Sequence, residues 1–221
     1  MNDRPLIDWD WIATHLDDLW ALTQEHIALT VIAVSVGFLI SFLLSLAVVR
    51  WRSAYGPITA LAGIMYAIPS LALFAALVPV TGLTSTTALI ALVSYTLLIL
   101  VRNIVTGIDG VPIDARDAAD GMGFTRSGRL WRVDLPLATP VIVAGLRIAT
   151  VTTIGLVTVS ALIGQGGLGR LIVDGLRRSF PTMTITGAVL SVLLAVIADI
   201  TFVLALRAMT PWARARAGSG T

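Results

Sequence analysis

The sequence has no cysteine, which excludes disulfide bonds, thiolate nucleophiles and cysteine metal sites. It also has no lysine, since all 15 basic side chains are arginine. Charged residues make up only 13% of the chain, compared with about 25% in an average soluble domain. So few charges would not cover a water-facing surface, and this excludes both an ordinary soluble enzyme and a disordered chain.

The chain contains long apolar runs instead. Hydrophobic residues make up 57% of the 221 residues, and they gather in runs of about 20 residues rather than in alternation. Such runs predict membrane-spanning helices and argue against an outer-membrane barrel. The sequence therefore predicts an all-α, polytopic membrane protein with about five transmembrane helices, at residues 27–49, 58–80, 86–101, 137–163 and 185–206.

The placement of the arginines predicts the orientation of these spans. Ten arginines fall on one side of the predicted membrane and four on the other, with Arg147 inside the fourth span. Arginine-rich loops remain in the cytoplasm, so the N-terminus is expected outside and the C-terminus inside. Residues 1–26 would then form an extracytoplasmic arm, residues 27–207 the transmembrane domain and residues 208–221 a cytoplasmic tail.

The N-terminal arm carries apolar side chains at the three- and four-residue spacing of one helix face. Tryptophan favours the headgroup layer, which suits an amphipathic helix on the outer membrane surface. A plain leader into the first span is an equally good interpretation, and both stay open. The face consists of Trp9, Ile12, Leu16, Leu19 and Trp20.

One long polar loop, residues 102–136, joins the third and fourth predicted spans. Asp114 is placed to cap a short helix, with Asp117 three residues later in the capping-box position. Gly121 and Gly123 would supply the positive φ that ends this helix. The sequence thus predicts a short helix and a tight turn in the middle of the loop.

A second short helix is expected after that turn. Thr125 is placed to cap it, and Arg126 lies in its first turn. Leu135–Pro136 would close it before the fourth span begins. The resulting helix–turn–helix, with exposed apolar and arginine side chains, suits docking to a soluble partner better than it suits chemistry.

The same loop resembles the EAA motif of ABC importer permeases. That motif reads Glu-Ala-Ala, three residues, Gly, nine residues, Ile, one residue, Leu-Pro. This chain departs from it at two positions, Asp117 for Glu and Val133 for Ile, and both changes preserve charge or shape. The resemblance implies a type I ABC importer fold like that of the methionine importer permease. It also implies contact with an ATPase through Asp117, Ala118, Ala119, Gly121, Gly123, Arg126, Leu135 and Pro136.

Further segments resemble the osmoprotectant branch of these permeases, which imports glycine betaine, choline, carnitine and related solutes. They are residues 68–74, 101–103, 121–123 and 163–169. The resemblance implies a multi-pass subunit of the bacterial cytoplasmic membrane. It also implies three partners: ABC ATPase subunits, an extracytoplasmic solute-binding protein and a second permease, as a copy or a paralogue.

No catalytic residue, metal site, bound cofactor or nucleic-acid partner is expected in this chain. It lacks a Gly-x4-Gly-Lys-Ser/Thr phosphate loop, so ATP and Mg²⁺ would bind the partner ATPase. A membrane enzyme or autonomous transporter is disfavoured, because only Arg147 and Asp199 are ionisable within the predicted spans. A permease of the same fold for an amino acid or another small solute remains the alternative.

Several residues are candidates for the translocation pathway or its gate. Pro69 and Ser70 interrupt the second span, where freed backbone would line a cavity or form a packing kink. Four glycines on the outer side, at positions 164, 166, 167 and 169, would form a moving or closely fitted loop at the pathway mouth. Asp199, within the fifth span, would be a gate residue or the partner of Arg147 or a hydroxyl. The candidates are therefore Pro69, Ser70, Gly164, Gly166, Gly167, Gly169 and Asp199.

Overall fold

The computed structural model describes residues 6–209. The predicted tail after Met209, and the terminal arginines Arg4, Arg214 and Arg216 used for the orientation, lie outside the described residues. Within residues 6–209 the chain is helical throughout, with short connections and no strand, as the apolar runs predict. Four of its helices are long and apolar enough to cross a membrane, or five crossings if one bent pair counts as a span.

The helices follow one another with short turns. Their bounds in chain order are α1 Trp9–Thr14, α2 Leu16–Arg50, α3 Tyr55–Ala67, α4 Ser70–Thr81, α5 Ser85–Asp109, α6 Ile113–Gly121, α7 Arg126–Arg129, α8 Leu135–Ser160, α9 Leu168–Arg177 and α10 Pro181–Met209. Short 3₁₀ turns at Arg52–Ala54 and Ala161–Ile163 and a π-helical segment at Leu130–Asp134 complete the order.

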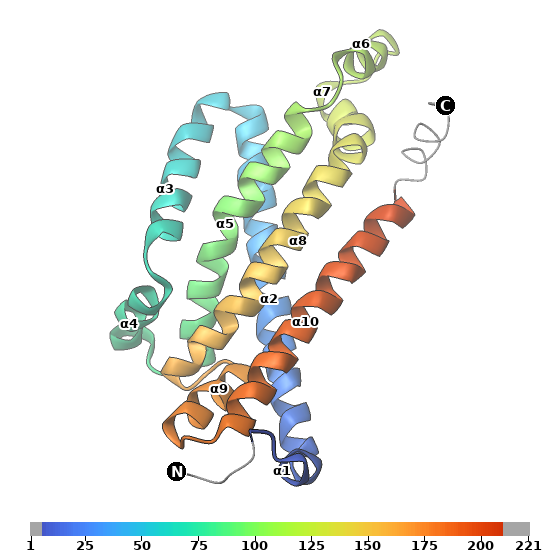
Figure 1. The fold of residues 1–221 in the computed structure, drawn as a ribbon. Coiled ribbons are helices and arrows are strands. Elements are labelled where there is room, and N and C mark those ends of the chain that lie inside the picture. Colours follow the sequence, from blue (N-terminus) through green and yellow to red (C-terminus); the bar gives the residue numbers. More distant parts are fainter. Residues whose placement is uncertain (1–5, 210–221) are drawn as a thin grey trace.

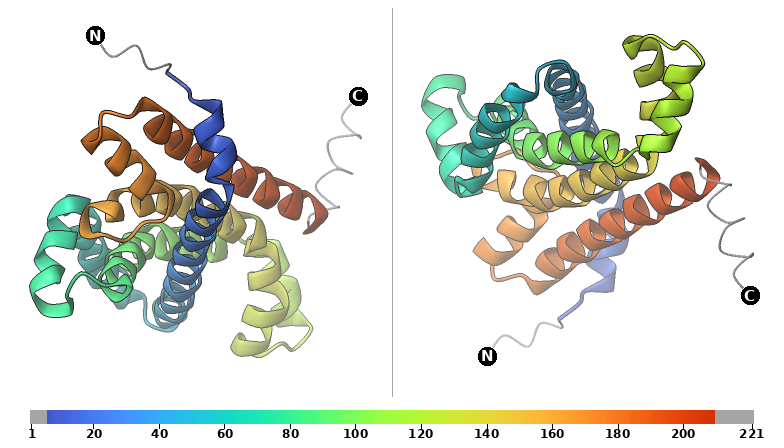
Figure 2. Two further views of the ribbon diagram at one scale, coloured as in Figure 1. Left: turned by 90° about the horizontal axis from the view of Figure 1, so that it is seen from below. Right: turned by 90° about the horizontal axis from the view of Figure 1, so that it is seen from above.

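Helix α5 forms the centre of the bundle and packs against α2 on one side and α8 on the other. Small residues allow the close approach. A Cβ at Gly37 of α2 would lie 1.9 Å from the Thr96 Oγ1 atom of α5, and one at Gly145 of α8 would lie 2.5 Å from the Asn103 Cβ atom. Helices α3 and α4 flank α5, whereas α10 lies against α8 and α9 on the opposite flank (Figure 2).

Different helices and loops lie at the two ends of the bundle (Figure 1). Helices α6 and α7 project at one end, which is the end that carries the arginine-rich loops. Helix α9, the glycine-rich loop before it and α1 gather at the other end. The two parts singled out from the sequence are thus separated by the full length of the spans.

The N-terminal arm is divided between α1 and the first turns of α2, which continues through residue 26 without a break. Of the predicted apolar face, Leu19 is buried, whereas Trp9, Leu16 and Trp20 are exposed. His26 is fully buried, and its Nε2 atom lies 3.1 Å from the Ile154 carbonyl oxygen of α8. Residues 16–26 therefore form the N-terminal end of the first spanning helix.

Candidate functional site

The two short loop helices exist, with different caps from those expected. Helix α6 is preceded by Pro112, and no side chain caps it, so the prediction of Asp114 as N-cap is wrong. A proline next to the first turn needs no hydrogen-bond partner, and Asp114 instead places its charge in that turn near the helix N-terminus. The Thr125 cap of α7 is confirmed, because its Oγ1 atom accepts a 3.1 Å hydrogen bond from the Gly128 N–H.

The turn between these helices depends on one glycine. Gly123 has a φ of +80°, whereas Gly121 remains inside α6 with no positive φ, so that part of the prediction is wrong. Met122 takes the C-cap position, and the turn needs only one left-handed residue. A Cβ at Gly123 would meet no heavy atom within 4 Å. The requirement for glycine there is conformational and not steric.

The expectation that Leu135–Pro136 ends the second short helix is also wrong. Helix α7 continues through the π-helical segment Leu130–Asp134 directly into α8, so residues Arg126–Ile163 form one long apolar helix. Pro136 lies in the first turn of α8. The wider π-helical turn before it relieves the clash that a proline ring makes in a regular α-helix. The loop is therefore joined to a membrane span by continuous helix.

Asp134 holds the loop together from the base of this helix. It is buried, and its Oδ1 atom accepts a 3.2 Å hydrogen bond from the Arg116 Nε–H of α6. Its Oδ2 atom lies 3.6 Å from the Arg129 Nε atom of α7, and Arg129 also pairs with Asp120. Arg116 donates a second hydrogen bond to the Ile108 carbonyl at the end of α5. One carboxylate thus ties both loop helices to the spans.

The loop presents most of its predicted coupling residues to solvent. Ala119 of α6 is buried, and Leu135 is half-buried. A cavity of about 950 Å³ lies beside these helices, and Arg50, Arg126 and Trp131 line part of it. The exposed members of the predicted set are Asp117, Ala118, Gly121, Gly123, Arg126 and Pro136.

Pro69 makes a full break in the second span. Helices α3 and α4 meet at an angle of 95°, and Ile68 between them is extended, as the residue before a proline prefers. The Tyr95 hydroxyl of α5 donates a 2.5 Å hydrogen bond to the Ile68 carbonyl. Ser70 then begins α4, which buries Phe74 against α5. The break is fixed in place by the central helix.

The glycine-rich loop is closely packed. Gly166 and Gly167 have φ values of +120° and +50°, and a Cβ on Gly167 would lie 2.5 Å from the Leu22 carbonyl oxygen of α2. Gly169 packs equally tightly, with its Cβ position 2.4 Å from the Thr158 carbonyl oxygen of α8. Gly164 also has a positive φ, but its Cβ position is open. Of the two alternatives, the close fit describes positions 166, 167 and 169.

A carboxylate from α2 holds this loop. The Glu25 Oε1 atom accepts hydrogen bonds from the Gly166 and Gly167 N–H groups, both at 3.3 Å. Its other oxygen pairs with Arg170 in the first turn of α9. Successive N–H groups with a positive-φ residue form a concavity that suits an anion, and here the anion is part of the chain itself.

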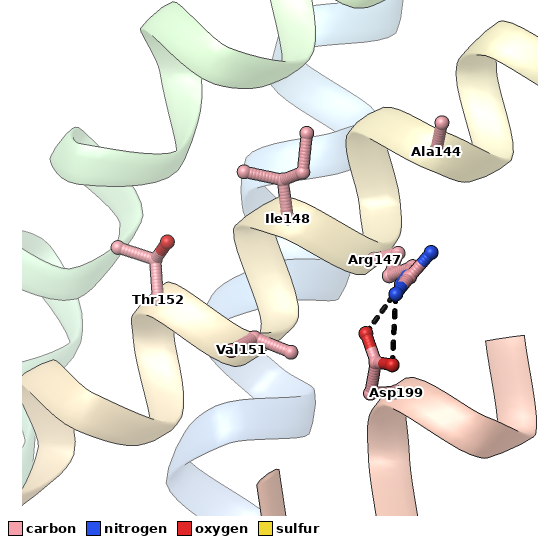
Figure 3. Close-up of a pocket in the computed structure, with 6 residues that line it drawn as sticks. All are labelled: Ala144, Arg147, Ile148, Val151, Thr152 and Asp199. Atoms are coloured by element: carbon pink, nitrogen blue, oxygen red, sulfur yellow. Dashed lines mark hydrogen bonds and ion pairs between the residues drawn. The ribbon is translucent and has the colours of Figure 1, made fainter. Parts of the chain in front are cut away.

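Arg147 and Asp199 form an ion pair between α8 and α10 (Figure 3). The Arg147 Nε–H and Nη2–H groups both donate to the Asp199 carboxylate, the second at 2.8 Å. This is the partner that the sequence allowed for Asp199. Both side chains remain partly open, with 45% of Arg147 and 32% of Asp199 exposed.

Sequence reasoning missed three groups that organise these sites. Asp134, Glu25 and Tyr95 each bond to a segment far away in the chain, and no local spacing marks them. The sequence offered little signal for Asp134, which is one of five aspartates in residues 102–136. Within residues 6–209, no cluster of three His, Cys, Asp or Glu side chains is placed to hold a metal ion.

Comparison with known proteins gives consistent matches over most of the chain. Residues 37–211 match the family described as "Binding-protein-dependent transport system inner membrane component". The choline transport system permease protein OpuBB of Bacillus subtilis (strain 168) is 37% identical over 201 residues, which cover 91% of this chain and 93% of that protein. The glycine betaine/carnitine/choline transport system permease protein OpuCB of the same organism is 35% identical with the same coverage.

A solved structure confirms the fold. The inward-facing MetNI methionine ABC transporter superposes with a TM-score of 0.78 at 22% identity, covering 89% of this chain and 98% of that chain. At this identity the likeness concerns the fold alone. It confirms the expectation of a helical type I importer fold like that of the methionine importer permease.

Proposed function

This chain belongs to the family of inner membrane components of binding-protein-dependent transport systems, and from this premise we propose that its cargo is a quaternary-ammonium compatible solute such as glycine betaine, carnitine or choline. The chain is a multi-pass permease subunit of an ABC importer and not itself an enzyme. The names of its relatives OpuBB and OpuCB support this cargo class.

The observation that carries the coupling role is the loop geometry. Residues 117–136 carry the spacing of the EAA motif from α6 to the first turn of α8, and the two short helices α6 and α7 project beyond the spans and are tied to α8 through Asp134. A force applied to the loop therefore reaches a membrane helix without passing through a flexible linker. We propose that an ABC ATPase binds this surface and supplies the nucleotide and Mg²⁺ chemistry.

The opposite end supports a second docking role. The glycine-rich loop, α9 and α1 lie there, and the arginine asymmetry assigns that end to the outside. A solute-binding protein is the proposed partner at this end. The subunit would act in the cytoplasmic membrane beside a second permease, either a copy or a paralogue, since most of α10 beyond Ser191 is uncovered in a single subunit.

The cargo is tested by uptake of labelled glycine betaine, choline and carnitine at high osmolarity, in cells with and without this gene. Loss of uptake of at least one of the three on deletion is the expected result. Unchanged uptake of all three together with lost uptake of an amino acid would favour the alternative cargo class.

The orientation is tested with single cysteines, because the chain has none of its own. Ser127 in α7 and Ser179 after α9 are both exposed and lie at opposite ends. A membrane-impermeant thiol reagent is expected to label Ser179→Cys in intact cells, and Ser127→Cys only after the cytoplasmic side is opened. The reverse pattern would refute both the orientation and the coupling role of the loop.

A further inference from the structure

The ion pair between Arg147 and Asp199 lies deep within the predicted membrane. Arg147 follows Leu135, the first residue of α8, by twelve residues, which places it about 18 Å along a helix with a 1.5 Å rise per residue. Asp199 lies ten residues before Met209, the end of α10, or about 15 Å from that end. Both charges are therefore close to the middle of a hydrocarbon core about 30 Å thick.

This pair is incompletely satisfied within the subunit. Arg147 uses Nε and Nη2 to bind Asp199, and its remaining nitrogen lies on the far side of the guanidinium (Figure 3). A guanidinium carries five N–H donors and a carboxylate accepts about four hydrogen bonds, so both groups keep capacity to bind. Exposing that capacity to lipid would be costly. The open side of the pair must therefore face water, cargo or another protein surface.

The space beside the pair has the character of a small-molecule site. A groove of about 300 Å³ runs along α8 and meets α10 at Asp199, and its volume is at the lower end of the range of ligand pockets. Its walls are mostly apolar, from Ala144, Ile148 and Val151, with Thr152 as a further polar group (Figure 3). Two opposite charges, a hydroxyl and methyl-rich walls thus meet in one groove.

We propose that this pair is a transient binding site for zwitterionic cargo on the translocation pathway, and this rests on the cargo class proposed above. The cargo carboxylate binds the Arg147 guanidinium, whose fork geometry suits a carboxylate. The quaternary ammonium of the cargo pairs with the Asp199 carboxylate, and the methyl groups on its nitrogen contact the apolar walls. The internal ion pair opens as the cargo enters and closes again behind it.

The exchange favours a zwitterion over a simple cation. A zwitterion replaces the partner of both charges at once, so no charge is left unpaired in the membrane. Choline carries only the cation, and its contact with Asp199 would leave Arg147 without a counter-charge. Glycine betaine and carnitine are therefore expected to depend on the pair, whereas choline passes without opening it.

The first test neutralises both charges together. In the double variant Arg147→Gln/Asp199→Asn, no single charge is left unpaired, and the two amides keep hydrogen-bonding capacity. Glycine betaine uptake is expected to fall about tenfold or more, while choline uptake stays within about twofold. The matched control is Arg52→Gln/Asp109→Asn, which removes an exposed Arg–Asp pair at the loop end and is expected to affect neither cargo.

The outcomes of this test separate the proposed cargo site from the proposed function. Equal loss of both cargos, or retention of both, would refute the binding site and leave the proposed function standing. If the wild type takes up choline but no zwitterionic solute, the binding site would also be refuted and the proposed function would still stand. Uptake of none of the quaternary-ammonium solutes by the wild type would refute the proposed function and the inference together.

A second readout does not depend on transport. Ile148→Cys places a lone thiol in the groove, and the control Leu39→Cys places one on α2 at a similar distance from its helix end; both native side chains are more than half exposed. In the assembled complex, a water-soluble thiol reagent is expected to label position 148 but not position 39. Glycine betaine, but not choline, is expected to slow this labelling. An unlabelled Ile148→Cys, or labelling that neither solute slows, would refute a cargo site in this groove.

Discussion

Asp134 offers the sharpest test of how the loop is held to the spans. It is 5% exposed, and its carboxylate meets Arg116 of α6 at 3.2 Å and Arg129 of α7 at 3.6 Å. The substitution Asp134→Asn keeps the size of the side chain but removes the charge. Two guanidinium groups then share one neutral amide, and the charged link that holds α6 and α7 to the base of α8 is weakened.

The size of the effect follows from the burial of the three side chains. Removing one partner of a buried ion pair costs about 3–5 kcal/mol, and here the arginines are 23% exposed, so water recovers part of that cost. A remaining loss of about 2 kcal/mol changes the ratio of ordered to disordered loop about thirtyfold. The matched control Asp109→Asn breaks the Arg52 pair, whose side chains are 58% and 40% exposed, and is expected to cost no more than about 1 kcal/mol.

The assay is co-purification of the permease with its ATPase, followed by ATP hydrolysis stimulated by loaded binding protein. Asp134→Asn is expected to weaken ATPase retention and stimulated hydrolysis at least about tenfold, while the thermal unfolding of the spans changes little. Asp109→Asn is expected to behave as wild type. If Asp134→Asn also kept both activities within about twofold, the loop would not depend on this anchor and the argument would be wrong.

Three further predictions concern single residues. Gly123→Leu should lower stimulated hydrolysis because of its φ of +80°, and Gly123→Asn, which tolerates that conformation, should retain most of it. Gly167→Ala should lower the free energy of unfolding by about 2–3 kcal/mol, measured by thermal unfolding, because its Cβ would lie 2.5 Å from a backbone oxygen. Gly164→Ala, whose Cβ would meet open space, should lower it by only about 1 kcal/mol. Tyr95→Phe leaves the Ile68 carbonyl without its hydrogen bond and should cost about 1–3 kcal/mol, whereas the exposed Tyr66→Phe should cost little.

The spans and the loop were predictable because their signals are local. Apolar runs located every long helix, although the structure extends several of them, as in α5, which reaches Asp109. The Thr125 cap and the Gly123 turn were readable from residue type and spacing alone. Each of these features depends on residues within one or two helical turns of one another.

Proline shows where local rules fail. Pro69 breaks its helix by 95°, whereas Pro79 and Pro140 lie inside continuous helices and Pro136 lies in a first turn. The ring disrupts the same backbone bond at each interior position, so the outcome depends on what satisfies the freed groups. At Pro69 the helix breaks instead, and the Tyr95 hydroxyl from a different span binds the Ile68 carbonyl at the break, a contact that no sequence pattern records.

Helix α8 and the π-helical segment before it connect the coupling loop, the Arg147–Asp199 pair and the glycine-rich loop. Asp134 anchors the loop at its start, Arg147 lies at its middle, and Val157 and Thr158 near its end accommodate the glycine-rich loop at Gly166 and Gly169. Because the helix is continuous from Arg126 to Ile163, it links the coupling loop, the groove and the glycine-rich loop without an intervening break. Helix α10 has its buried residues only between Thr182 and Ser191 among those described, so few buried side chains hold its opposite half to α8. The Arg147–Asp199 pair bridges these two helices in that sparsely packed half, so opening the pair for cargo would remove a direct link between α8 and α10.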